Sequence, residues 1–424
     1  MLEKPKLFLN LKEFWLAVLL LLLLLFVRLF FLYGEFQEFR EKPFYYSDVE
    51  VIQAYEKWKE NEYHTILKLY SPALDMNFFS RTKIRQEEIT SKIRLKLFPN
   101  KKMHFLDYLG TPYISSLVRE IYDDEESPKR DIFTFIERQH HNDEIRSFYK
   151  AIYFATPIEK SLRNRVSTLG VSHLIALSGF HLAILSSLLF FLLRIFYRPL
   201  QQRFFPYRFD LFDIGFMVLL LLAWYVWFVG SPPSLVRSYT MMLVGWIVLL
   251  LGVELISTTF LVTVVLILLV IFPMLLLSLA FWFSVAGVFY IFLLLHYFST
   301  VNRYLMTLLI SVVIFILMLP IVHMIFPLVS SLQIFSPILS LIFSLFYPIS
   351  MLLHLFGVGD IFDTMLIKLF TLEAKEHLFL LPSYYGVLYL LLSFCAIFSR
   401  WLFYLLLLVS TLFAIGLFSG FLVS

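Results

Sequence analysis

The pattern of hydrophobic and polar positions divides the chain into one polar segment and a series of long apolar runs. The first run, Phe14 to Leu32, is long enough to cross a hydrocarbon core of about 30 Å as a helix. No small-residue cleavage site follows it, so we expect an anchor rather than a removed signal peptide. A second run begins near Val166, after the polar segment. Eight more follow, at about Leu211 to Val229, Leu235 to Leu251, Ile256 to Phe272, Leu275 to Phe298, Tyr304 to Phe326, Leu332 to Phe356, Phe379 to Phe398 and Leu402 to Leu422. We therefore expect about ten transmembrane or re-entrant helices.

The polar segment has a different period. In "SKIRLKLF", Ser91 to Phe98, apolar and basic residues alternate, which is typical of a half-buried strand. Similar runs occur in "DVEVIQAYEKW" and "EYHTILKLYS", and prolines separate them. These runs predict a small β-rich barrel or sandwich that ends near Tyr122. The pattern breaks at "DDEESPKR", Asp123 to Arg130, and the residues from Ile132 to Arg165 have a helical pattern.

The expected architecture is an α-helical polytopic membrane protein with a small β-rich domain inserted after the first transmembrane helix. Its four parts are an N-terminal anchor at 1–33, an exported β domain at 34–122, a helical connector at 123–165 and a polytopic domain at 166–424. The stretch from Gly357 to His377 is amphipathic and too charged to span, so it is predicted to be an interfacial helix.

Composition agrees with a membrane protein. Of 424 residues, 60% are hydrophobic and 16% charged, which is too much apolar surface for one water-soluble globule. The region from Gly34 to Arg165 alone holds 22 basic and 22 acidic residues of the chain's 35 and 31. The net charge of +4 is small and says little about partners. Cys395 is the only cysteine, which excludes an intramolecular disulfide and a multi-cysteine metal site.

Basic residues predict the orientation. Lys4, Lys6 and Lys12 precede the first apolar run, which places the N-terminus in the cytoplasm and the polar domain outside. After the next predicted crossing, a short loop carries Arg194, Arg198, Arg203 and Arg208, and such a loop is expected to be cytoplasmic. The two predictions agree with each other.

Common enzyme motifs are missing. The chain has no GxxxxGK[ST] phosphate loop, no HExxH helix and no HxHxDH metal cluster. ATP hydrolysis or metallohydrolase chemistry by these routes is therefore not expected, and no cofactor or metal site is predicted.

One apolar run carries an unusual group of polar residues. In "HLIALSGFH", His173, Ser178, Gly179 and His181 fall within nine residues. On one continuous helix the two histidines would be about 80° apart, whereas Ser178 and His181 would share a face. Gly179 permits close approach by another backbone or local unwinding. A small-residue packing notch explains each residue alone, but ionisable groups at membrane depth usually face a cavity or pathway, so the group predicts a functional site.

A second stretch, "GSPPSLVRSYTMM" from Gly230 to Met242, lies between two apolar runs. Its two prolines predict a break or a re-entrant turn, and Arg237 follows in the next helix. An ordinary turn between helices, with Arg237 reaching the interface, explains the stretch equally well.

The β domain has a basic patch. From Arg81 to Lys102 there are eight basic residues against Glu87 and Glu88, a local charge of +6. Together with nearby aromatic side chains they predict phosphate contacts and base stacking on a barrel of oligonucleotide-binding (OB) type. A solvated face or contact with anionic lipid is the alternative. The predicted DNA-binding residues are Arg81, Lys83, Arg85, Lys92, Arg94, Lys96, Lys101 and Lys102.

The motifs resemble those of the ComEC family of competence DNA channels. "GVSHLIALSGFHLAIL", Gly170 to Leu185, is similar to the family's G-L-S-H-L-L-A-I-S-G-L-H signature. "GSPPSLVRSYTMM" is similar to its S-P-x-x-x-R-A motif, with Ser238 in place of the usual alanine. "PMLLLSLAFWFSVAGV" is similar to the third motif, with Phe281 and Trp282 where a polar pair is common. The resemblance extends from the N-terminal anchor to about Pro348.

The resemblance implies a channel in the bacterial inner membrane that passes single-stranded DNA into the cytoplasm during natural transformation. It implies partners as well: a periplasmic DNA receptor and a cytoplasmic ATP-driven helicase or single-strand-binding protein. The metallo-β-lactamase-like domain of many relatives is absent, so any strand degradation would need a separate nuclease, and the chain itself is expected not to be an enzyme. The predicted channel-lining residues are His173, Ser178, Gly179, His181, Ser231, Pro232, Ser234 and Arg237.

Two alternatives remain open at this point. "ALSG", Ala176 to Gly179, is similar to the sequence around the nucleophile of rhomboid-like intramembrane serine proteases, with Ser178 as the nucleophile. His181 is expected to be poorly placed as its base, and His296 or His323 could serve instead. The other alternative is a binding or assembly subunit whose exported domain only holds DNA.

Overall fold

The computed structural model describes residues 7–8, 10–59, 62–85, 89, 92–122, 128–250 and 257–423. They fall into two compact units. The β unit comprises Asn10–Ile132 and Thr263–Phe281, and the helical unit comprises Met1–Leu9, Phe133–Val262 and Trp282–Ser424. Some features of the sequence lie outside the described residues: Lys4, Lys6, Glu87, Glu88 and most of the predicted break, at 123–127.

The β unit begins with the long helix α1 (Leu11–Glu41), which continues past the predicted end of the anchor at residue 33. The first part of α1 exposes a dense series of leucines, as expected of a lipid-facing helix. Its last turns bury Phe36 and Phe39 in the core of the sheet domain. The anchor and the β domain are therefore joined by a continuous helix.

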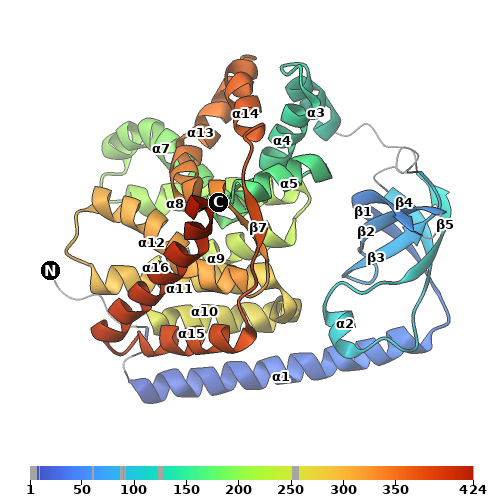
Figure 1. Ribbon diagram of the computed structural model, residues 1–424, viewed down its shortest axis with the longest axis horizontal. Helices are drawn as coiled ribbons and strands as arrows, with labels where there is room; N and C mark the ends of the chain where they lie inside the picture. The colour runs from blue at the N-terminus through green and yellow to red at the C-terminus, as the bar shows by residue number, and fades with distance from the viewer. Residues whose placement is uncertain are drawn as a thin grey trace. The chain divides into compact units, whose positions relative to one another are not determined.

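Five strands form one antiparallel sheet in the order β3-β2-β1-β4-β5 (Figure 1). A parallel bridge between Phe79 on β3 and Tyr113, just before β5, brings the two ends of this order together. The short helix α2 (Phe105–Leu109) lies between β4 and β5 in the chain. The strand bounds are β1 Tyr45–Lys59, β2 Glu62–Ser71, β3 Met76–Thr82, β4 Lys92–Phe98 and β5 Ser115–Ile121.

The predicted strands are confirmed where alternation was clear. "SKIRLKLF" forms β4, in which Ile93, Leu95 and Leu97 are buried while Lys92 and Arg94 are exposed. The other two predicted runs form β1 and β2. Side chains on a strand point alternately to its two faces, so one face supplies the core and the other is left polar.

The helical unit begins with three helices, α3 (Pro128–Glu137, whose last residues belong to this unit), α4 (Asp143–Phe154) and α5 (Lys160–Thr168), where a helical connector was predicted. Asn142 caps α4 by accepting hydrogen bonds from the backbone amides of Glu144 and Ile145. The remaining elements are α6 Ser172–Ile175, α7 Gly179–Phe204, α8 Asp210–Val229, α9 Pro233–Leu250, α10 Thr258–Ile271, η2 Pro273–Leu277, α11 Leu279–Tyr297, α12 Arg303–His323, β6 Leu328–Ser330, η3 Ser331–Phe335, α13 Ser336–Leu355, η4 Gly359–Phe362, α14 Asp363–Phe370, β7 Glu376–Leu378, α15 Ser383–Cys395 and α16 Arg400–Val423. Of these, η2 and the adjoining parts of α10 and α11 belong to the β unit.

Length separates these apolar helices into two groups. In the described part of the chain, seven are long and apolar enough to cross a membrane: α1, α7, α8, α11, α12, the helix made by η3 and α13, and α16. Three more are apolar but shorter, at Ser234–Leu250, Thr258–Ile271 and Ser383–Cys395. Each of the ten predicted runs contains a helix in the described part of the chain, and seven of these helices are of spanning length there.

One prediction is wrong in part. The stretch from Gly357 to His377 was expected to be a single interfacial helix, but only η4 and α14 are helical, ending at Phe370. From Glu376 the chain is extended as β7 and pairs with β6. The partner strand supplies the hydrogen bonds that a helix would otherwise provide, which the sequence pattern does not show.

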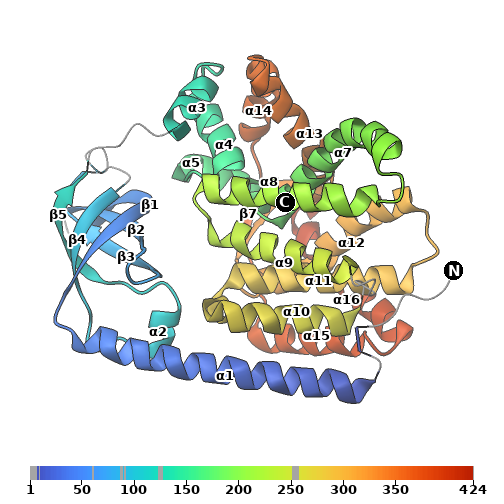
Figure 2. The same cartoon turned by 180° about the vertical axis from the view of Figure 1, so that it is seen from behind.

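Several buried clusters hold the helical unit together, and three of them are large. One gathers residues of α4, α5, α6, α13 and α14, another those of α7, α8 and α9, and the third those of α11, α12, α15 and α16. Figure 2 shows α7, α8 and α9 one after another on one side of this unit. The two polar motifs lie where the first two clusters adjoin, because Leu174 and Ile175 belong to one and Leu177 and Leu235 to the other.

Candidate functional site

The first motif is not one helix. Helix α6 ends at Ile175, Ala176 is extended with φ −64° and ψ 117°, and Ser178 is extended with φ −137° and ψ 178° before α7 begins at Gly179. The expected relation of His173 and His181 on a continuous helix is therefore wrong, whereas local unwinding beside Gly179 is found. We call the extended residues 176–178 the first break.

His181 is held at the start of α7. Its Nδ1 accepts a hydrogen bond from the backbone N–H of Ser178 (3.4 Å) and lies 3.3 Å from the Ser178 hydroxyl. Its ring is only 1% exposed and packs edge-on against Phe343 and Tyr347 of α13, with ring centroids 5.2 and 5.0 Å away. His181 is thus close to Ser178, contrary to the expectation of poor placement. The hydrogen bond to its Nδ1 and the packing of its ring hold the start of α7 in place.

The second motif forms a tight turn between α8 and α9. Gly230 and Ser231 both have left-handed backbones, with φ of 97° and 51°. The Ser231 amide donates to the Val226 carbonyl (2.8 Å), which closes the end of α8 in the way typical of a glycine-terminated helix. Helix α9 then starts at Pro233, where a missing N–H costs nothing. We call residues 230–234, which are the turn and the first residues of α9, the second break; the predicted break is found here.

The two breaks are in contact. The Ser234 hydroxyl donates to the Leu177 carbonyl over 2.7 Å, so α9 satisfies a backbone acceptor that the first break leaves without a helical partner. A Cβ on Gly179 would lie 3.0 Å from the Ser238 hydroxyl, so only glycine permits this approach of α7 to α9 without displacement. Two motifs more than fifty residues apart thus form one site.

Helix α13 forms the third side of the site. Ser336 donates to the Gly170 carbonyl (2.9 Å), and His173 Nε2 lies 3.2 Å from the Ser340 hydroxyl. A Cβ on Gly170, whose φ is +70°, would meet the Gln333 side chain at 3.0 Å. Gln333 lies in η3, just before α13. The two α13 residues, Ser336 and Ser340, were not singled out from the sequence. A serine at every fourth position, 336, 340 and 344, was the signal available for them.

Exposure divides the predicted channel-lining residues. His173 and Ser231 are exposed, Ser178, Gly179, Pro232 and Ser234 are half-buried, and His181 and Arg237 are buried, the latter with 7% of its surface exposed. All eight lie around the two breaks, but His181 and Arg237 are enclosed by protein in this conformation.

The basic residues of the β unit are mostly on its surface. Seven of the eight predicted DNA-binding residues are exposed: Arg81, Lys83, Arg85, Lys92, Arg94, Lys101 and Lys102. Lys96 is half-buried because its ammonium lies over aromatic rings, 3.9 Å from the ring centre of Phe44, 5.7 Å from Tyr46 and 5.5 Å from Phe98. We call these four residues the aromatic–lysine platform.

Acidic neighbours offset part of the basic patch. Arg94 lies 3.7 Å from both Asp48 and Glu120, and these charges together with the Tyr122 phenol raise its pKa. Exposed ion pairs of this kind contribute little stability, but they lower the local positive potential. The patch is therefore less basic than the +6 counted along the sequence.

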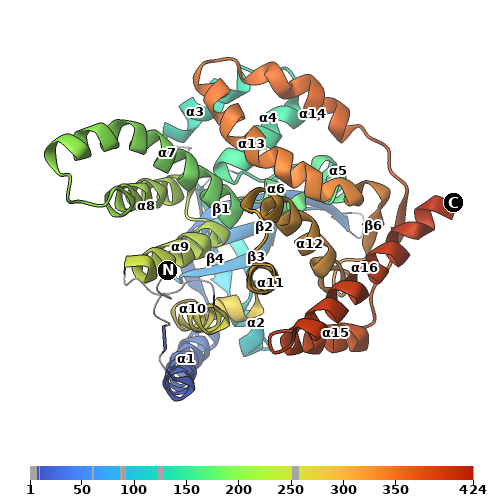
Figure 3. The ribbon, with the colours of Figure 1, turned by 90° about the vertical axis from the view of Figure 1, so that its left-hand side faces the viewer.

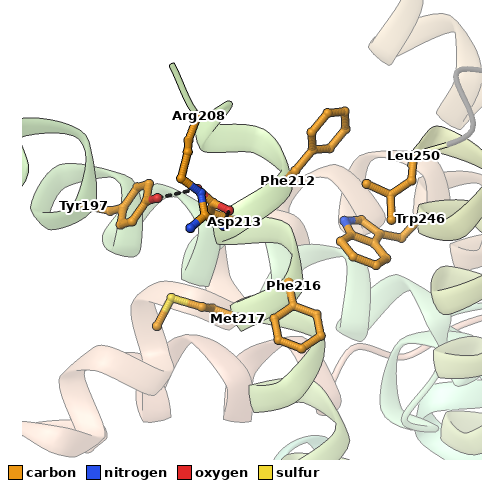
Figure 4. Close-up of a pocket in the computed structure, with 8 residues that line it drawn as sticks. All are labelled: Tyr197, Arg208, Phe212, Asp213, Phe216, Met217, Trp246 and Leu250. Atoms are coloured by element: carbon orange, nitrogen blue, oxygen red, sulfur yellow. Dashed lines mark hydrogen bonds and ion pairs between the residues drawn. The ribbon is translucent and has the colours of Figure 1, made fainter. Parts of the chain in front are cut away.

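A separate pocket lies near the turn between α7 and α8. It has a volume of about 430 Å³ and is lined by the eight residues drawn in Figure 4. Asp213 accepts hydrogen bonds from Tyr197 and from Arg208 (2.6 Å to the latter), and Arg194 pairs with Asp210 at 2.9 Å. Arg194 and Arg208 thus fasten the α7–α8 turn. The predicted loop is shorter than expected, because α7 continues to Phe204 and contains Arg194, Arg198 and Arg203. The pocket is lined by none of the motif residues.

Apolar helices of spanning length, with polar breaks between them, define a multi-pass membrane protein. Residues 155–423 match the family model described as competence protein. This match covers more than half of the chain, so the protein belongs to the competence protein family. It extends past Pro348, where the sequence resemblance ended, and it starts after the β unit's sheet. No curated protein and no solved structure matches the chain.

Proposed function

We propose that this protein forms the channel through which single-stranded DNA crosses the bacterial inner membrane during natural transformation. The observation that carries the proposal is the joining of the two breaks by the Ser234–Leu177 hydrogen bond and the Gly179–Ser238 approach. Non-helical backbone at membrane depth is tolerated only where protein covers it or where it borders water. Membership in the competence family supports a role in DNA uptake.

A polyanion needs such breaks. Each phosphate carries a full charge, and a charge at the centre of a bilayer costs several kcal/mol, so a strand crosses only along a wet polar path. Serine hydroxyls, an imidazole and a guanidinium can donate hydrogen bonds to phosphate oxygens without one deep binding site. We assign these roles to Ser178, Ser234, His181 and Arg237.

The burial of His181 and Arg237 is consistent with a closed conformation. His181 is covered by Phe343 and Tyr347 of α13, so these two rings would have to move away before its imidazole faced a strand. We infer that opening separates α13 from the start of α7. His173 and Ser231, which are exposed here, would mark the ends of the path.

The β unit has the features of a receptor for single strands. The pairing order with its parallel β3-to-β5 bridge is compatible with a closed OB-type barrel. On the aromatic–lysine platform, Phe44 and Tyr46 are exposed, so that bases can stack beside a cation. We propose that residues 34–165 are exported, that the N-terminus is cytoplasmic, and that the chain is a conduit and not an enzyme.

The proposed partners follow from this orientation. A periplasmic receptor would present DNA to the β unit, and a cytoplasmic helicase or single-strand-binding protein would take the entering strand. A separate nuclease would remove the other strand.

Transformation with labelled DNA in a deletion strain tests the proposal. We expect labelled DNA to reach the periplasm and to be protected there from external nuclease, but not to enter the cytoplasm. Restoring the gene should restore cytoplasmic label. Normal cytoplasmic uptake in the deletion strain would refute the channel.

Replacing Ser178 with alanine separates the channel from an intramembrane protease. The Ser178 hydroxyl lies 3.3 Å from His181 Nδ1, but the same nitrogen already accepts the Ser178 amide, and the other ring nitrogen is buried with no carboxylate partner in the described chain. In a Ser-His-Asp triad a carboxylate orients the histidine, and His181 has no such partner among the described residues. We expect Ser178→Ala to retain DNA uptake within about threefold, equivalent to under 1 kcal/mol.

The measurement is transformation frequency at equal protein level in the membrane. A loss of about 10³-fold or more, the size expected when a nucleophile is removed, would favour the protease instead.

A further inference from the structure

Three titratable side chains, two buried histidines and a half-buried aspartate, form a hydrogen-bonded series away from both breaks. Asp363 places both carboxyl oxygens 2.9 Å from His140 Nδ1, and His140 Nε2 lies 2.9 Å from His354 Nε2. His140 comes from the turn between α3 and α4, His354 from the last turn of α13, and Asp363 begins α14. Figures 1 and 3 show α4, α13 and α14 beside one another. We call the three residues the Asp–His–His series.

The surrounding structure fixes the rings. His140 is 1% and His354 4% exposed, and Tyr149 stacks on His140 with ring centroids 4.5 Å apart. Gln139 accepts from the Gly359 amide (2.8 Å) and donates to the His354 carbonyl (3.2 Å), which closes the site. A Cβ on Gly359 would lie 2.6 Å from His354 Nε2, so only glycine fits here.

The contacts of the Asp–His–His series show how many hydrogens it must hold. His354 Nδ1 lies 2.6 Å from the Ser350 carbonyl, which can only accept, so Nδ1 carries a hydrogen. A second hydrogen must lie between the two Nε2 atoms, and a third between His140 and Asp363. Two neutral imidazoles bring only two hydrogens. The third is therefore an additional proton, shared by the His140 ring and the Asp363 carboxyl, and it makes the series neutral as a whole.

Loss of that proton has a structural consequence. One contact of the series then has no hydrogen, so two lone pairs face each other across about 2.9 Å in a buried site. An unpaired buried polar group is costly, and the remaining negative charge is costlier still. The separation of α14 from the α3–α4 turn would relieve both.

We propose that Asp363, His140 and His354 form a binding site for one exchangeable proton, and that its occupancy controls the attachment of α14 to the α3–α4 turn. The ligand is the proton itself. The inference rests on the contacts within the helical unit and does not depend on the proposed channel function.

The groups that face the site set the direction of its pH dependence. Burial is the main cause that raises the pKa of Asp363, the bond and charge of His140 oppose it, and Asp360 adds to it. His141 also faces Asp363, and Arg146 donates to the His140 carbonyl over 2.9 Å. A raised carboxyl pKa means that the folded state retains the proton above the ordinary value of about 3.9 and loses it as pH rises. Attachment is thus favoured at low pH.

The neighbouring phenols do not obscure this dependence. Burial raises the pKa of Tyr149 and of Tyr153 on α4, so both stay neutral through the physiological range.

A metal ion fits the site less well. Only the two Nε2 atoms face each other, 2.9 Å apart, and no group of three or more metal-binding side chains occurs in the described residues. Structural zinc takes four ligands, so this arrangement lacks half the required set.

The test measures the distance between α14 and the α3–α4 turn. Full-length protein in lipid nanodiscs, with Cys395 replaced by serine, carries spin labels at the exposed positions Arg138 and Lys368. Double electron–electron resonance at pH 5.5 and pH 9 gives the fraction of molecules in a longer-distance population. We expect this fraction to rise about tenfold between the two values, because loss of the proton leaves one contact of the series without a hydrogen.

Two isosteric variants decide the origin of the change. Asp363→Asn supplies the third hydrogen from its amide without a titratable carboxyl, so the short distance should persist at both pH values. Asp360→Asn removes a nearby carboxylate outside the series and should keep the wild-type dependence. His140→Gln, which cannot bridge both partners, should show the longer distance already at pH 5.5.

Other outcomes would overturn the proposal. These are an unchanged wild-type distance, a wild-type pH dependence retained in Asp363→Asn, or a stoichiometric metal ion in the purified protein that His140→Gln removes.

Discussion

Replacing Gly179 with alanine is expected to lower transformation frequency by at least about tenfold. The new Cβ would lie 3.0 Å from the Ser238 hydroxyl and 3.3 Å from its Cβ, closer than packed atoms normally come. Overpacking of this kind costs about 1–3 kcal/mol, and 1.4 kcal/mol is a factor of ten in an equilibrium. Since α7 and α9 meet at this point, the cost falls on the contact that joins the two breaks.

A compensating variant makes this prediction specific. Ser238→Gly removes both atoms that the new methyl group would meet, so the double variant Gly179→Ala, Ser238→Gly should recover most of the lost activity, less about 1 kcal/mol for glycine within a helix. Gly245→Ala on the same helix α9 is the matched control, because nothing lies within 4 Å of its Cβ position. Membrane levels of each variant are measured by immunoblot. Equal loss in Gly179→Ala and in the double variant would show that the approach of α7 to α9 does not matter.

Reversal of Lys92, Arg94 and Lys96 to glutamate is expected to weaken binding of single-stranded DNA by at least about a hundredfold at low salt. The change removes three cations from β4 and replaces the ammonium of Lys96, which lies over the exposed Phe44 and Tyr46, with an anion. Phosphate contacts make affinity fall with salt, with a slope of about 0.7 per neutralised phosphate on single strands. Fluorescence anisotropy of a labelled oligonucleotide with full-length protein, at about 50 and 200 mM salt, gives the binding affinity and its dependence on salt.

The matched control reverses Arg138, Lys160 and Arg163, three exposed residues in and near the helices of the connector. It makes the same change in net charge on the helical unit instead of the β unit, so it should leave affinity within about threefold. If both triple variants lose affinity alike, binding depends on overall charge and not on the β unit. If DNA transport persists while binding by the β unit vanishes, the two functions are separable.

Much of the architecture follows from local patterns. The apolar runs predicted each of the long helices because burial in lipid depends on composition over about twenty residues, which is visible along the chain. Alternation in "SKIRLKLF" predicted β4, its buried face and its exposed basic face. The two prolines, Pro232 and Pro233, predicted the second break, since proline restricts the backbone wherever it occurs.

Other features depend on partners that are distant in sequence. The first break could not be located by pattern, because the Leu177 carbonyl loses its helical partner only where Ser234 replaces it. The extended residues at β7 likewise depend on β6. His354 lies in the apolar run from Leu332 to Phe356, yet it meets His140, 214 positions away.

The sequence by itself determined that this is a multi-pass membrane protein with a polar β-rich segment and two interrupted apolar runs. Hydrophobic length, strand alternation and the backbone limits of proline and glycine are local properties, so they can be read one segment at a time. Only the tertiary structure decided that the two breaks share one site, that His181 and Arg237 are buried there, and that Asp363, His140 and His354 need one additional proton. Each of these depends on which side chains meet across helices, where short-range packing and hydrogen-bond geometry select the contact.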